Sequence, residues 1–390
     1  MTETKLPVKN MTAPTEYLKD MEQTDPALIE KLFSYLDEIN FGPFTNYEVS
    51  AALESRRPTP RDLAALLSLT AEKRLEDLAQ KARRLTREHF GNSINLFTPL
   101  YIANYCENSC LYCGFNSKNN IKRARLNEEE IERELKTIAQ TGLSEILILT
   151  GESQKKSDLD YIGRAAEIAR KYFHLVGIEI YPLNSDDYAI LQKKGVDYVT
   201  IFQETYDVKR YAALHPYGRK RVFSYRFNAQ ERPIAGGLRG VGFGSLFGLS
   251  DFRIDALATG IHAYLIQRKY PHAEISFSCP RLRPIPGNTF PLAGRISQKN
   301  LLQIICAFRL FMPFAGITVS SRENIIFRNN IVDIAATRIS AGVHINIGGH
   351  CGKIKGDEQF EINDNRSLAE IFSMLKERGL QPVLSDYLYV

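Results

Sequence analysis

From about residue 97 onward, the chain alternates short apolar runs with charged amphipathic stretches. The runs that we interpret as strands are LFTPLYIA, EILILT (145–150), LVGIEIY (175–181), DYVTIF (197–202), GVGFGSLFGL (240–249), EISFSC (274–279), GITVSS (316–321) and GVHINIG (342–348). Several are apolar throughout, as is typical of parallel strands buried on both faces. Eight such units, separated by helical stretches, predict an α/β fold. They favour a (β/α)8 TIM-type barrel over a doubly wound sheet, which has the same local pattern.

The first ninety-five residues follow a helical pattern instead. An amphipathic stretch, ALIEKLFSYLDEI, begins just after Pro26, and two further helical patterns follow it. We therefore expect a helical N-terminal extension (1–95) and a barrel (96–350). The remaining C-terminal segment (351–390) is expected to carry a helix that packs on the barrel.

Composition and charge restrict the classes of partner. Lys and Arg total 50 against 45 Asp and Glu, so the net charge is only +5. This is a weak preference for anionic partners and does not indicate nucleic acid. No apolar run is long enough to cross a bilayer, and the start, MTETKLPVKNMTAPTEYL, lacks the charged-then-apolar order of a secretory signal. We expect a cytoplasmic protein with no nucleic-acid or membrane partner.

Three of the six cysteines lie within eight residues, just beyond the first predicted strand. Cys106, Cys110 and Cys113 have C-x3-C-x2-C spacing, and a (β/α)8 barrel carries its chemistry at the carboxyl ends of its strands. Three thiolates on one loop can bind three irons of a 4Fe-4S cluster and leave the fourth iron open. S-adenosyl-L-methionine (SAM) can chelate that iron through its amino and carboxylate groups, whereas a cluster held by four cysteines suits electron transfer.

Other interpretations of these cysteines are a zinc site or a set of buried apolar thiols. Zinc favours paired C-x2-C or Cys/His spacings, and no second cysteine pair exists, although His215, His344 or His350 could in principle complete a site. We interpret Cys279 and Cys306 as core residues. Cys351 is assigned no role.

The cysteine motif resembles that of the radical SAM superfamily, whose loop has an aromatic residue before its last cysteine. Tyr112 occupies that position. The run LFTPLYIANYCENSCLYCGF, followed in order by LTGES, IFQETYD, GFGSLFGLSD, SCPRLRP and SSRE, resembles the aromatic amino-acid lyases of that superfamily. The nearest resemblance is to the 2-iminoacetate synthase family, and the ending GLQPVLSDYLYV is also similar. These motifs extend over most of the chain from about residue 97.

This resemblance implies a tyrosine lyase of thiamine-thiazole biosynthesis. Such an enzyme cleaves the Cα–Cβ bond of L-tyrosine to p-cresol and 2-iminoacetate (dehydroglycine), while SAM yields methionine and 5′-deoxyadenosine. It implies a thiazole synthase as partner and flavodoxin or ferredoxin as reductant.

Three alternatives remain open. A sister tyrosine lyase of hydrogenase maturation goes on to make carbon monoxide and cyanide at a second cluster. That cluster needs further cysteines in a C-terminal extension, and no cysteine follows Cys351. The chain could also be a lyase for another aromatic amino acid, or a non-enzymatic, metal-bearing scaffold module.

Polar residues after the second and fourth predicted strands are candidates for SAM binding. Gly151 lets the backbone approach a ligand, and the Glu152 carboxylate can receive the SAM ammonium. The resemblance implies that this position contacts the methionine half of SAM, although a strand-ending turn is the commoner meaning of Thr-Gly-Glu. Glu204 is a candidate SAM contact, with Gln203 and Tyr206 lining the site.

Three arginines have two interpretations each. Arg226 either pairs with these acids or is a solvated surface residue. After the sixth strand, Arg281 or Arg283 either binds a carboxylate, such as that of SAM, or forms a structural ion pair. The glycine-rich run GVGFGSLFG (240–248) fits no phosphate-loop pattern, and we expect it to approach the adenosyl group of SAM.

The substrate carboxylate has a candidate partner after the seventh strand, in SSRE. Arginine offers a planar fork for a carboxylate, and the tryptophan-lyase pattern that this motif resembles assigns that role to Arg322. The same resemblance implies substrate-side roles for Ser340 and Tyr101. From spacing alone, Tyr101 would be ordinary barrel core.

Overall fold

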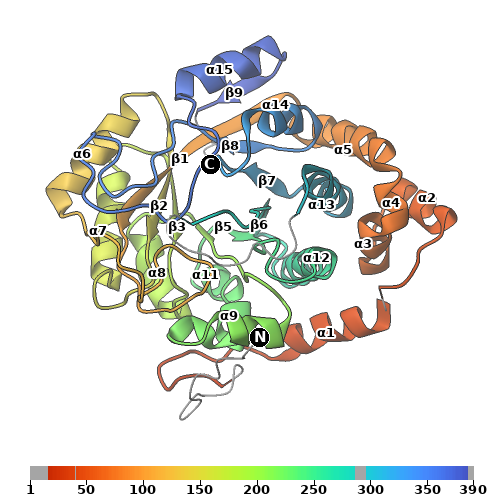
Figure 1. Ribbon diagram of the computed structural model, residues 1–390, viewed down its shortest axis with the longest axis horizontal. Coiled ribbons are helices and arrows are strands. Elements are labelled where there is room, and N and C mark those ends of the chain that lie inside the picture. Colours follow the sequence, from red (N-terminus) through yellow and green to blue (C-terminus); the bar gives the residue numbers. More distant parts are fainter. Residues whose placement is uncertain (1–15, 40, 286–295, 385–390) are drawn as a thin grey trace, which may run out of the picture.

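The computed structural model describes residues 16–39, 41–285 and 296–384, and its strands close into a parallel barrel (Figure 1). Most of the N-terminal stretch and the last six residues of the C-terminal ending considered above lie outside the described residues. Strands β2 to β8 follow one another in order, and β1 pairs with both β8 and β2. The strands are β1 (Ser93–Ala103), β2 (Glu145–Thr150), β3 (Leu175–Glu179), β4 (Tyr198–Thr200), β5 (Gly240–Phe243), β6 (Glu274–Ser278), β7 (Gly316–Val319) and β8 (Arg338–Ser340). The predicted (β/α)8 barrel is confirmed.

Buried apolar residues explain why these short segments pair. Every residue of β2 is buried, and β2 sits between β1 and β3 in a continuous parallel register. In β1, alternate residues from Phe97 to Tyr101 point into the barrel lumen, where they line the cavities. The lumen is therefore a packed apolar interior whose polar residues gather at the carboxyl ends of the strands.

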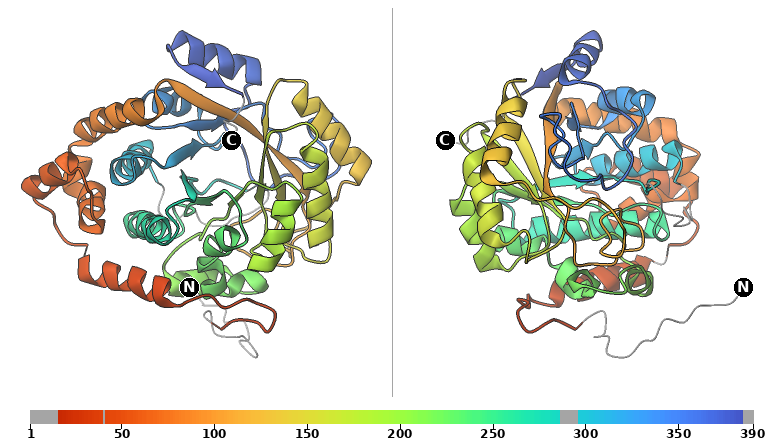
Figure 2. Two further views of the ribbon diagram at one scale, coloured as in Figure 1. Left: turned by 180° about the vertical axis from the view of Figure 1, so that it is seen from behind. Right: turned by 60° about the vertical axis from the view of Figure 1, so that its left-hand side comes forward.

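Helices surround the strands in a ring (Figures 1 and 2). Well-defined caps begin many of them; for example, Asn127 and Glu130 form a capping box at the start of α6. These helices are α6 (Glu128–Ala139), α7 (Leu159–Ala169), α8 (Ser185–Lys193), α9 (Val208–Leu214), α10 (Phe223–Phe227), α11 (Glu231–Ala235), α12 (Phe252–Lys269), α13 (Gln298–Phe311) and α14 (Ile325–Ile334), with a 3-10 turn, η1 (Arg219–Arg221), between α9 and α10.

The predicted helical N-terminal segment is confirmed, and it forms part of this outer ring. It comprises α1 (Ala27–Ile39), α2 (Asn46–Glu54), α3 (Pro60–Leu67), α4 (Leu69–Glu72) and α5 (Leu75–Phe90). Helix α5 packs on α13 and α14, whereas α3 packs on α12 and α13. At the α3–α12 contact, a Cβ on Gly260 would lie 2.4 Å from Leu63 Cδ2, so glycine permits this close approach.

The C-terminal part differs from the prediction in two ways. The eighth strand is Arg338–Ser340, not the run at 342–348, whose buried isoleucines pack without joining the barrel. After α15 (Leu368–Glu377), a ninth strand, β9 (Gln381–Val383), pairs in parallel with the first residues of β1. Segments nearly three hundred residues apart therefore lie side by side (Figure 1).

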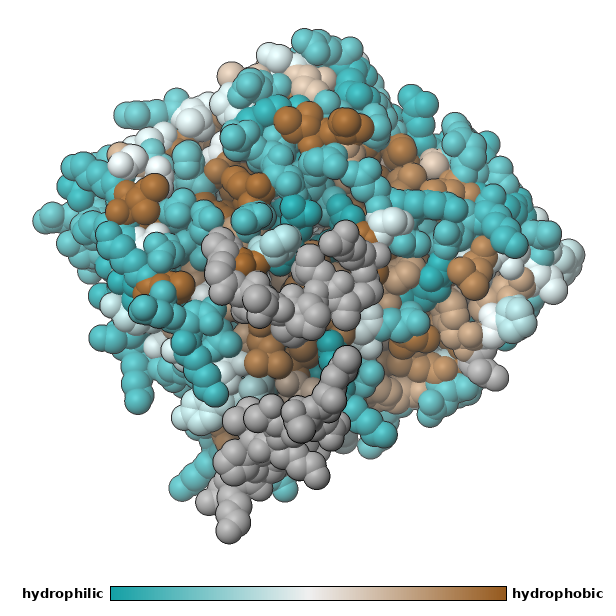
Figure 3. All heavy atoms as spheres, viewed as in Figure 1, coloured by the Kyte–Doolittle hydropathy of each residue, from teal (hydrophilic) through white to brown (hydrophobic). Residues whose placement is uncertain are grey.

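The surface of the molecule is mixed in character. On the face drawn in Figure 3, hydrophobic side chains form small separate areas among hydrophilic ones. In the part of the chain that the structure describes, none of the helices has the length and apolar character that crossing a membrane requires.

Candidate functional site: a cysteine loop over the barrel mouth

The cysteine loop leaves the carboxyl end of β1 and is clamped at its base. The Asn104 side chain donates to Lys122 O at 2.9 Å and accepts from Ala124 N at 2.8 Å. Arg123 donates to Asn104 O at 2.6 Å and to Phe115 O at 2.9 Å. These bonds tie the two ends of the loop together, so its shape does not depend on regular secondary structure.

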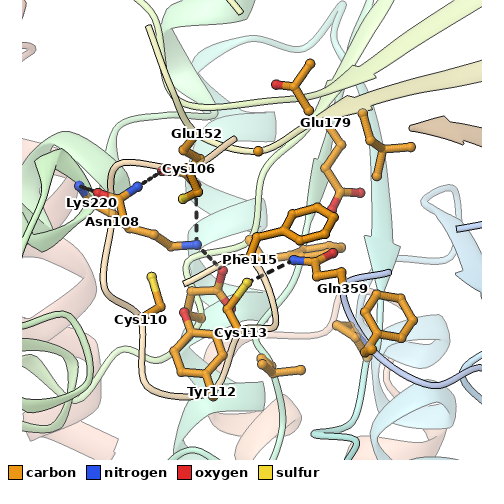
Figure 4. Close-up of a pocket in the computed structure, with 18 of the residues that line it drawn as sticks. Cys106, Asn108, Cys110, Tyr112, Cys113, Phe115, Glu152, Glu179, Lys220 and Gln359 are labelled. Atoms are coloured by element: carbon orange, nitrogen blue, oxygen red, sulfur yellow. Dashed lines mark hydrogen bonds and ion pairs between the residues drawn. The ribbon is translucent and has the colours of Figure 1, made fainter. Parts of the chain in front are cut away.

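The three thiols of the loop line one pocket (Figure 4). The cysteines form no disulfide, and asparagine side chains fix their backbone: Asn116 donates to Cys110 O at 3.0 Å and Asn119 to Cys113 O at 3.3 Å. Burial raises the pKa of Cys106 to about 12, and it also raises the pKa of Cys110 and of Cys113. The thiols stay protonated in the absence of a metal, and metal binding would release their protons.

The spread of the thiols bears on the kind of metal they could hold. Among residues 16–39, 41–285 and 296–384, no three His, Cys, Asp or Glu side chains converge on a position for one ion. The thiols lie around the wall of the pocket instead. A cubane cluster uses such a spread, because each thiolate binds a different iron.

Tyr112, the aromatic residue before the last cysteine, is held by a neutral histidine. His215 Nδ1 lies 2.7 Å from Tyr211 O, a pure acceptor, so Nδ1 carries the proton. Nε2 then accepts the Tyr112 hydroxyl at 2.7 Å. Burial, reinforced by the charge of Lys220, holds the pKa of His215 well below its ordinary value. Both of its nitrogens are engaged, and it does not line the pocket.

Two acidic and two cationic side chains form a buried charged cluster beside the thiols: Glu152, Glu204, Lys220 and Arg226. Lys220 Nζ lies 2.7 Å from Glu204 and 3.3 Å from Glu152, and Arg226 Nη1 lies 2.9 Å from Glu152. Asn108, from the cysteine loop, donates to the other oxygen of Glu152 at 2.8 Å (Figure 4). The cluster therefore joins the loop to the ends of β2 and β4, and Arg226 is not a solvated surface residue.

Two backbone features bring this cluster close to the loop. Gly151 donates its N–H to Ala103 O at 2.9 Å, and a Cβ on Gly151 would lie 2.3 Å from Tyr105 O. Glu204 has a φ of +73°, the left-handed region, and its carbonyl accepts Leu246 N at 2.9 Å. The glycine-rich run thus reaches the pocket wall through Leu246.

Two residues expected to line the site do not. From Tyr198 to Glu204, every second side chain faces the lumen, so Gln203 points into the barrel wall, where it is fully buried. The Tyr206 side chain also turns away from the pocket, and its hydroxyl lies 2.9 Å from His262 Nδ1. The structure therefore places Glu204 on the pocket wall and its neighbours Gln203 and Tyr206 outside the pocket.

The arginines after β6 have different environments. Arg281 forms a bidentate ion pair with Glu323 and donates to Ile296 O at 2.6 Å, which corresponds to the structural interpretation. Arg283 lines the pocket, and its Nε is buried without a hydrogen-bond partner in the described part of the chain. Only Arg283 is therefore placed to meet a ligand.

The residues assigned to the substrate side adjoin the thiols. Arg322 lines the pocket and stacks on Phe360, with Cζ 3.4 Å from the ring centre. The Tyr101 hydroxyl donates to Gln359 at 3.2 Å, and Gln359 in turn donates to Cys113 Sγ at 3.3 Å. Ser340 lies deeper, in a lumen cavity that Arg322 and Tyr101 also line, and its Oγ accepts Ser321 N at 3.0 Å.

Three pocket residues were missed in the sequence. Glu179 is a lone acid in an otherwise apolar strand, a signal that could have been used. Lys220 is the middle residue of the run Arg219-Lys220-Arg221, a pattern that is typical of a solvated surface. Gln359 lies in a loop with no distinguishing pattern. Burial, opposed by the charge of Arg322, raises the pKa of Glu179 to about 7.

Comparisons with known proteins agree with this geometry. The model of the Radical SAM superfamily matches residues 100–245, and that of the Biotin and Thiamin Synthesis associated domain matches 278–381. The chain is 39% identical to the 2-iminoacetate synthase of Salmonella typhimurium over 88% of this chain and 91% of that protein. Its identity to the Escherichia coli 2-iminoacetate synthase is 38%, with the same coverage. The crystal structure of HydG, a maturase of the FeFe-hydrogenase, matches with a TM-score of 0.84 and 30% identity over 91% of this chain and 80% of HydG. The chain belongs to the radical SAM superfamily, in the family of the 2-iminoacetate synthases.

Proposed function

We propose that this protein cleaves the Cα–Cβ bond of L-tyrosine to 2-iminoacetate and p-cresol. The observation that carries the proposal is the meeting, in one pocket, of the three thiols, the buried charged cluster and Arg322. The identity to curated 2-iminoacetate synthases over most of the chain supports tyrosine as the substrate.

The cysteine loop is proposed to hold the cofactor. Radical SAM proteins use a 4Fe-4S cluster and SAM, which together supply a 5′-deoxyadenosyl radical when bound. Cys106, Cys110 and Cys113 would each bind one iron. Tyr112, fixed by His215, would close the site beside them. The burial of Cys110 and Tyr112 would help to exclude water from a reactive centre.

The charged cluster and Arg283 are proposed to bind SAM. Glu152 and Glu204 offer carboxylate oxygens to the amino and hydroxyl groups of SAM, while Lys220 and Arg226 form ion pairs with these acids. The charges of Lys220 and Arg226 hold the pKa of Glu152 below its ordinary value despite burial. Arg283, whose Nε has no hydrogen-bond partner among the described residues, would receive the SAM carboxylate, and Gly151 leaves room for the backbone to approach.

The substrate is proposed to lie between the thiols and the barrel lumen. The Arg322 guanidinium, oriented by its contact with Phe360, would bind the tyrosine carboxylate through two parallel hydrogen bonds. Tyr101 would contact the substrate, and Ser340 would support the turn that carries Arg322. The apolar lumen below would take the aromatic ring; its lining includes Phe97, Leu147, Leu149, Ile305 and Val319.

Partners and domain limits are part of the proposal. A low-potential electron donor, flavodoxin or ferredoxin, would reduce the cluster, and a thiazole synthase would receive 2-iminoacetate. We retain the division into an N-terminal extension (1–95), a barrel (96–350) and a C-terminal segment (351–390). Gln359 and Phe360, from the last of these, line the pocket, so the C-terminal segment would be part of the site.

The test is anaerobic reconstitution followed by product analysis with SAM and dithionite, with tyrosine and tryptophan offered separately. We expect p-cresol and 5′-deoxyadenosine in equal amounts from tyrosine, and no p-cresol or 3-methylindole from tryptophan. Formation of 5′-deoxyadenosine without p-cresol would mean that the substrate is not tyrosine.

A further inference from the structure

Two charged side chains of the pocket, Glu179 and Arg322, form no ion pair within the described residues. The carboxylate of Glu179 makes no hydrogen bond or ion pair there, and the guanidinium of Arg322 makes only its stacking contact with Phe360. In contrast, both acids of the neighbouring cluster, Glu152 and Glu204, are paired with cations. Both side chains are half-buried on the pocket wall, so a ligand that displaces water from them must supply the partners that the described residues do not.

The two side chains come from opposite sides of the barrel. Strands β3 and β7 are four positions apart in a ring of eight, so Glu179 and Arg322 face each other across the barrel mouth. Both line the pocket that holds the thiols, and both also line the apolar lumen cavity below it. In Figure 4 the Glu179 side chain points into the pocket, next to Phe115. A small ligand held between them would lie where the two cavities join.

A free α-amino acid has the complementary charges on a single carbon atom. Its carboxylate requires a cation and its ammonium group an anion, and Arg322 and Glu179 offer one of each. We propose that Glu179 binds the α-ammonium group of the substrate, opposite the carboxylate held by Arg322. The aromatic side chain then points down into the lumen, and Cα and Cβ lie at the junction, below the thiols. This inference rests on the proposed function, because it takes tyrosine as the ligand.

The lumen alone would not restrict the substrate to amino acids. Its apolar wall would bind any phenol of the right size, so the two charges provide the selection for a zwitterion. A site that hydrogen-bonds a polar group rejects analogues that lack this group, because its own buried groups are then left unpaired. Glu179 is therefore a specificity-determining residue for the ammonium end, as Arg322 is for the carboxylate end.

The experiment compares Glu179→Gln with its matched partner variant, Arg322→Gln, in binding. The reconstituted proteins are saturated with SAM without reductant. Dissociation constants are then measured for tyrosine, for tyramine (no carboxylate) and for 3-(4-hydroxyphenyl)propanoate (no ammonium). For Glu179→Gln we expect tyrosine and tyramine to bind at least about tenfold more weakly and the propanoate to change less than about twofold. Arg322→Gln should weaken tyrosine and the propanoate and spare tyramine.

The outcomes separate this inference from the proposed function. If the unaltered protein binds and cleaves tyrosine but Glu179→Gln binds all three ligands normally, or loses all three equally, then Glu179 does not hold the ammonium group and only this inference fails. If the unaltered protein does not bind tyrosine, both the inference and the proposed function fail. Iron content and thermal unfolding of each variant show that the fold and the cluster are retained.

Discussion

The cysteine loop combines thiols of raised pKa with a rigid backbone. Because burial raises the pKa of Cys110 well above its ordinary value, this thiol is an inert small side chain until iron binds it. Burial also raises the pKa of the two other thiols of the loop, Cys106 and Cys113. The three therefore act as a set, and removing one leaves two ligands that cannot hold a cubane.

We predict that Cys110→Ala abolishes both the cluster and SAM cleavage. Reconstituted protein should retain less than about a tenth of the normal iron and sulfide and form no 5′-deoxyadenosine. Cys351→Ala is the control, because that thiol contacts Thr137 on α6 and does not line the pocket. Normal activity in Cys110→Ala would contradict the assignment of the ligands.

Replacement of Arg322 by lysine should impair the binding of tyrosine. A point charge reproduces neither the two parallel hydrogen bonds nor the stacking on Phe360. We predict that Arg322→Lys raises the KM for tyrosine at least about tenfold and changes the dissociation constant of SAM less than about twofold. Steady-state kinetics and equilibrium dialysis measure the two quantities. Equal losses for both ligands would remove Arg322 from the substrate site.

The carboxyl of Glu179 links stability to pH in the metal-free protein. Its pKa rises from 4.5 to about 7 on folding, so the folded state keeps a proton that the unfolded chain releases in this interval. The stability that this proton contributes is complete below the unfolded value and is lost as pH rises through the folded one.

Glu179→Gln removes this titration. Relative to the unaltered protein, the variant should therefore gain roughly 1–3 kcal/mol in free energy of unfolding between about pH 5 and about pH 8. Urea unfolding of both proteins at the two pH values gives the difference. If the free energies of unfolding of the two proteins differ by the same amount at both pH values, then Glu179 titrates normally.

At the scale of elements, the residues of the site lie at the carboxyl ends of strands. The alternation of side chains along each strand decides which of them face the pocket. The sequence could predict that polar residues after β2, β4 and β7 share one end of the barrel, because parallel strands have a common direction. It could not distinguish Gln203 from Glu204. The phase of alternation depends on which side chains of a three-residue strand face inward.

The eighth strand shows a second limit of sequence patterns. GVHINIG alternates as a strand should, yet Arg338–Ser340 makes the pairs with β7 and β1. A strand of three residues is too short for periodicity to reveal, and tertiary pairing overrides the local pattern. Glu179 was missed for a related reason, since one acid within an apolar run does not disturb a strand prediction.

The turn after β2 needs a glycine. A Cβ at position 151 would lie 2.3 Å from Tyr105 O, a backbone atom that cannot move without shifting the cysteine loop. We predict that Gly151→Ala weakens SAM binding at least about tenfold and lowers cluster content. Equilibrium dialysis and iron analysis measure the two effects.

Gly316→Ala, at the start of β7, is the matched control. The nearest atom to its added Cβ is a serine side-chain carbon at 3.3 Å, and Gly316 does not line the pocket of the thiols. Unchanged SAM binding in Gly151→Ala would show that the loop does not depend on this contact.

For the whole molecule, closure of the barrel is what assembles the site. The pocket draws on the loop after β1, the ends of β2, β3 and β4, the turn after β7, and the C-terminal Gln359 and Phe360. Helix α3 packs on α12 and α13 from outside, and helix α5 packs on α13 and α14, so these N-terminal helices support the wall without reaching the pocket. The fold can be predicted from the alternation of apolar runs with helical stretches. Gln359, in contrast, joins the site through a loop whose sequence has no pattern that predicts it.

The most direct test of the central claim is the fate of tyrosine labelled with carbon-13 at Cα. After anaerobic turnover with SAM and reductant, we predict unlabelled p-cresol and labelled glyoxylate, the hydrolysis product of 2-iminoacetate, in amounts equal to 5′-deoxyadenosine. That result would establish Cα–Cβ cleavage with release of the two-carbon fragment. Label found in cyanide would mean that the fragment is broken down further, and label that remains in intact tyrosine beside 5′-deoxyadenosine would contradict the account.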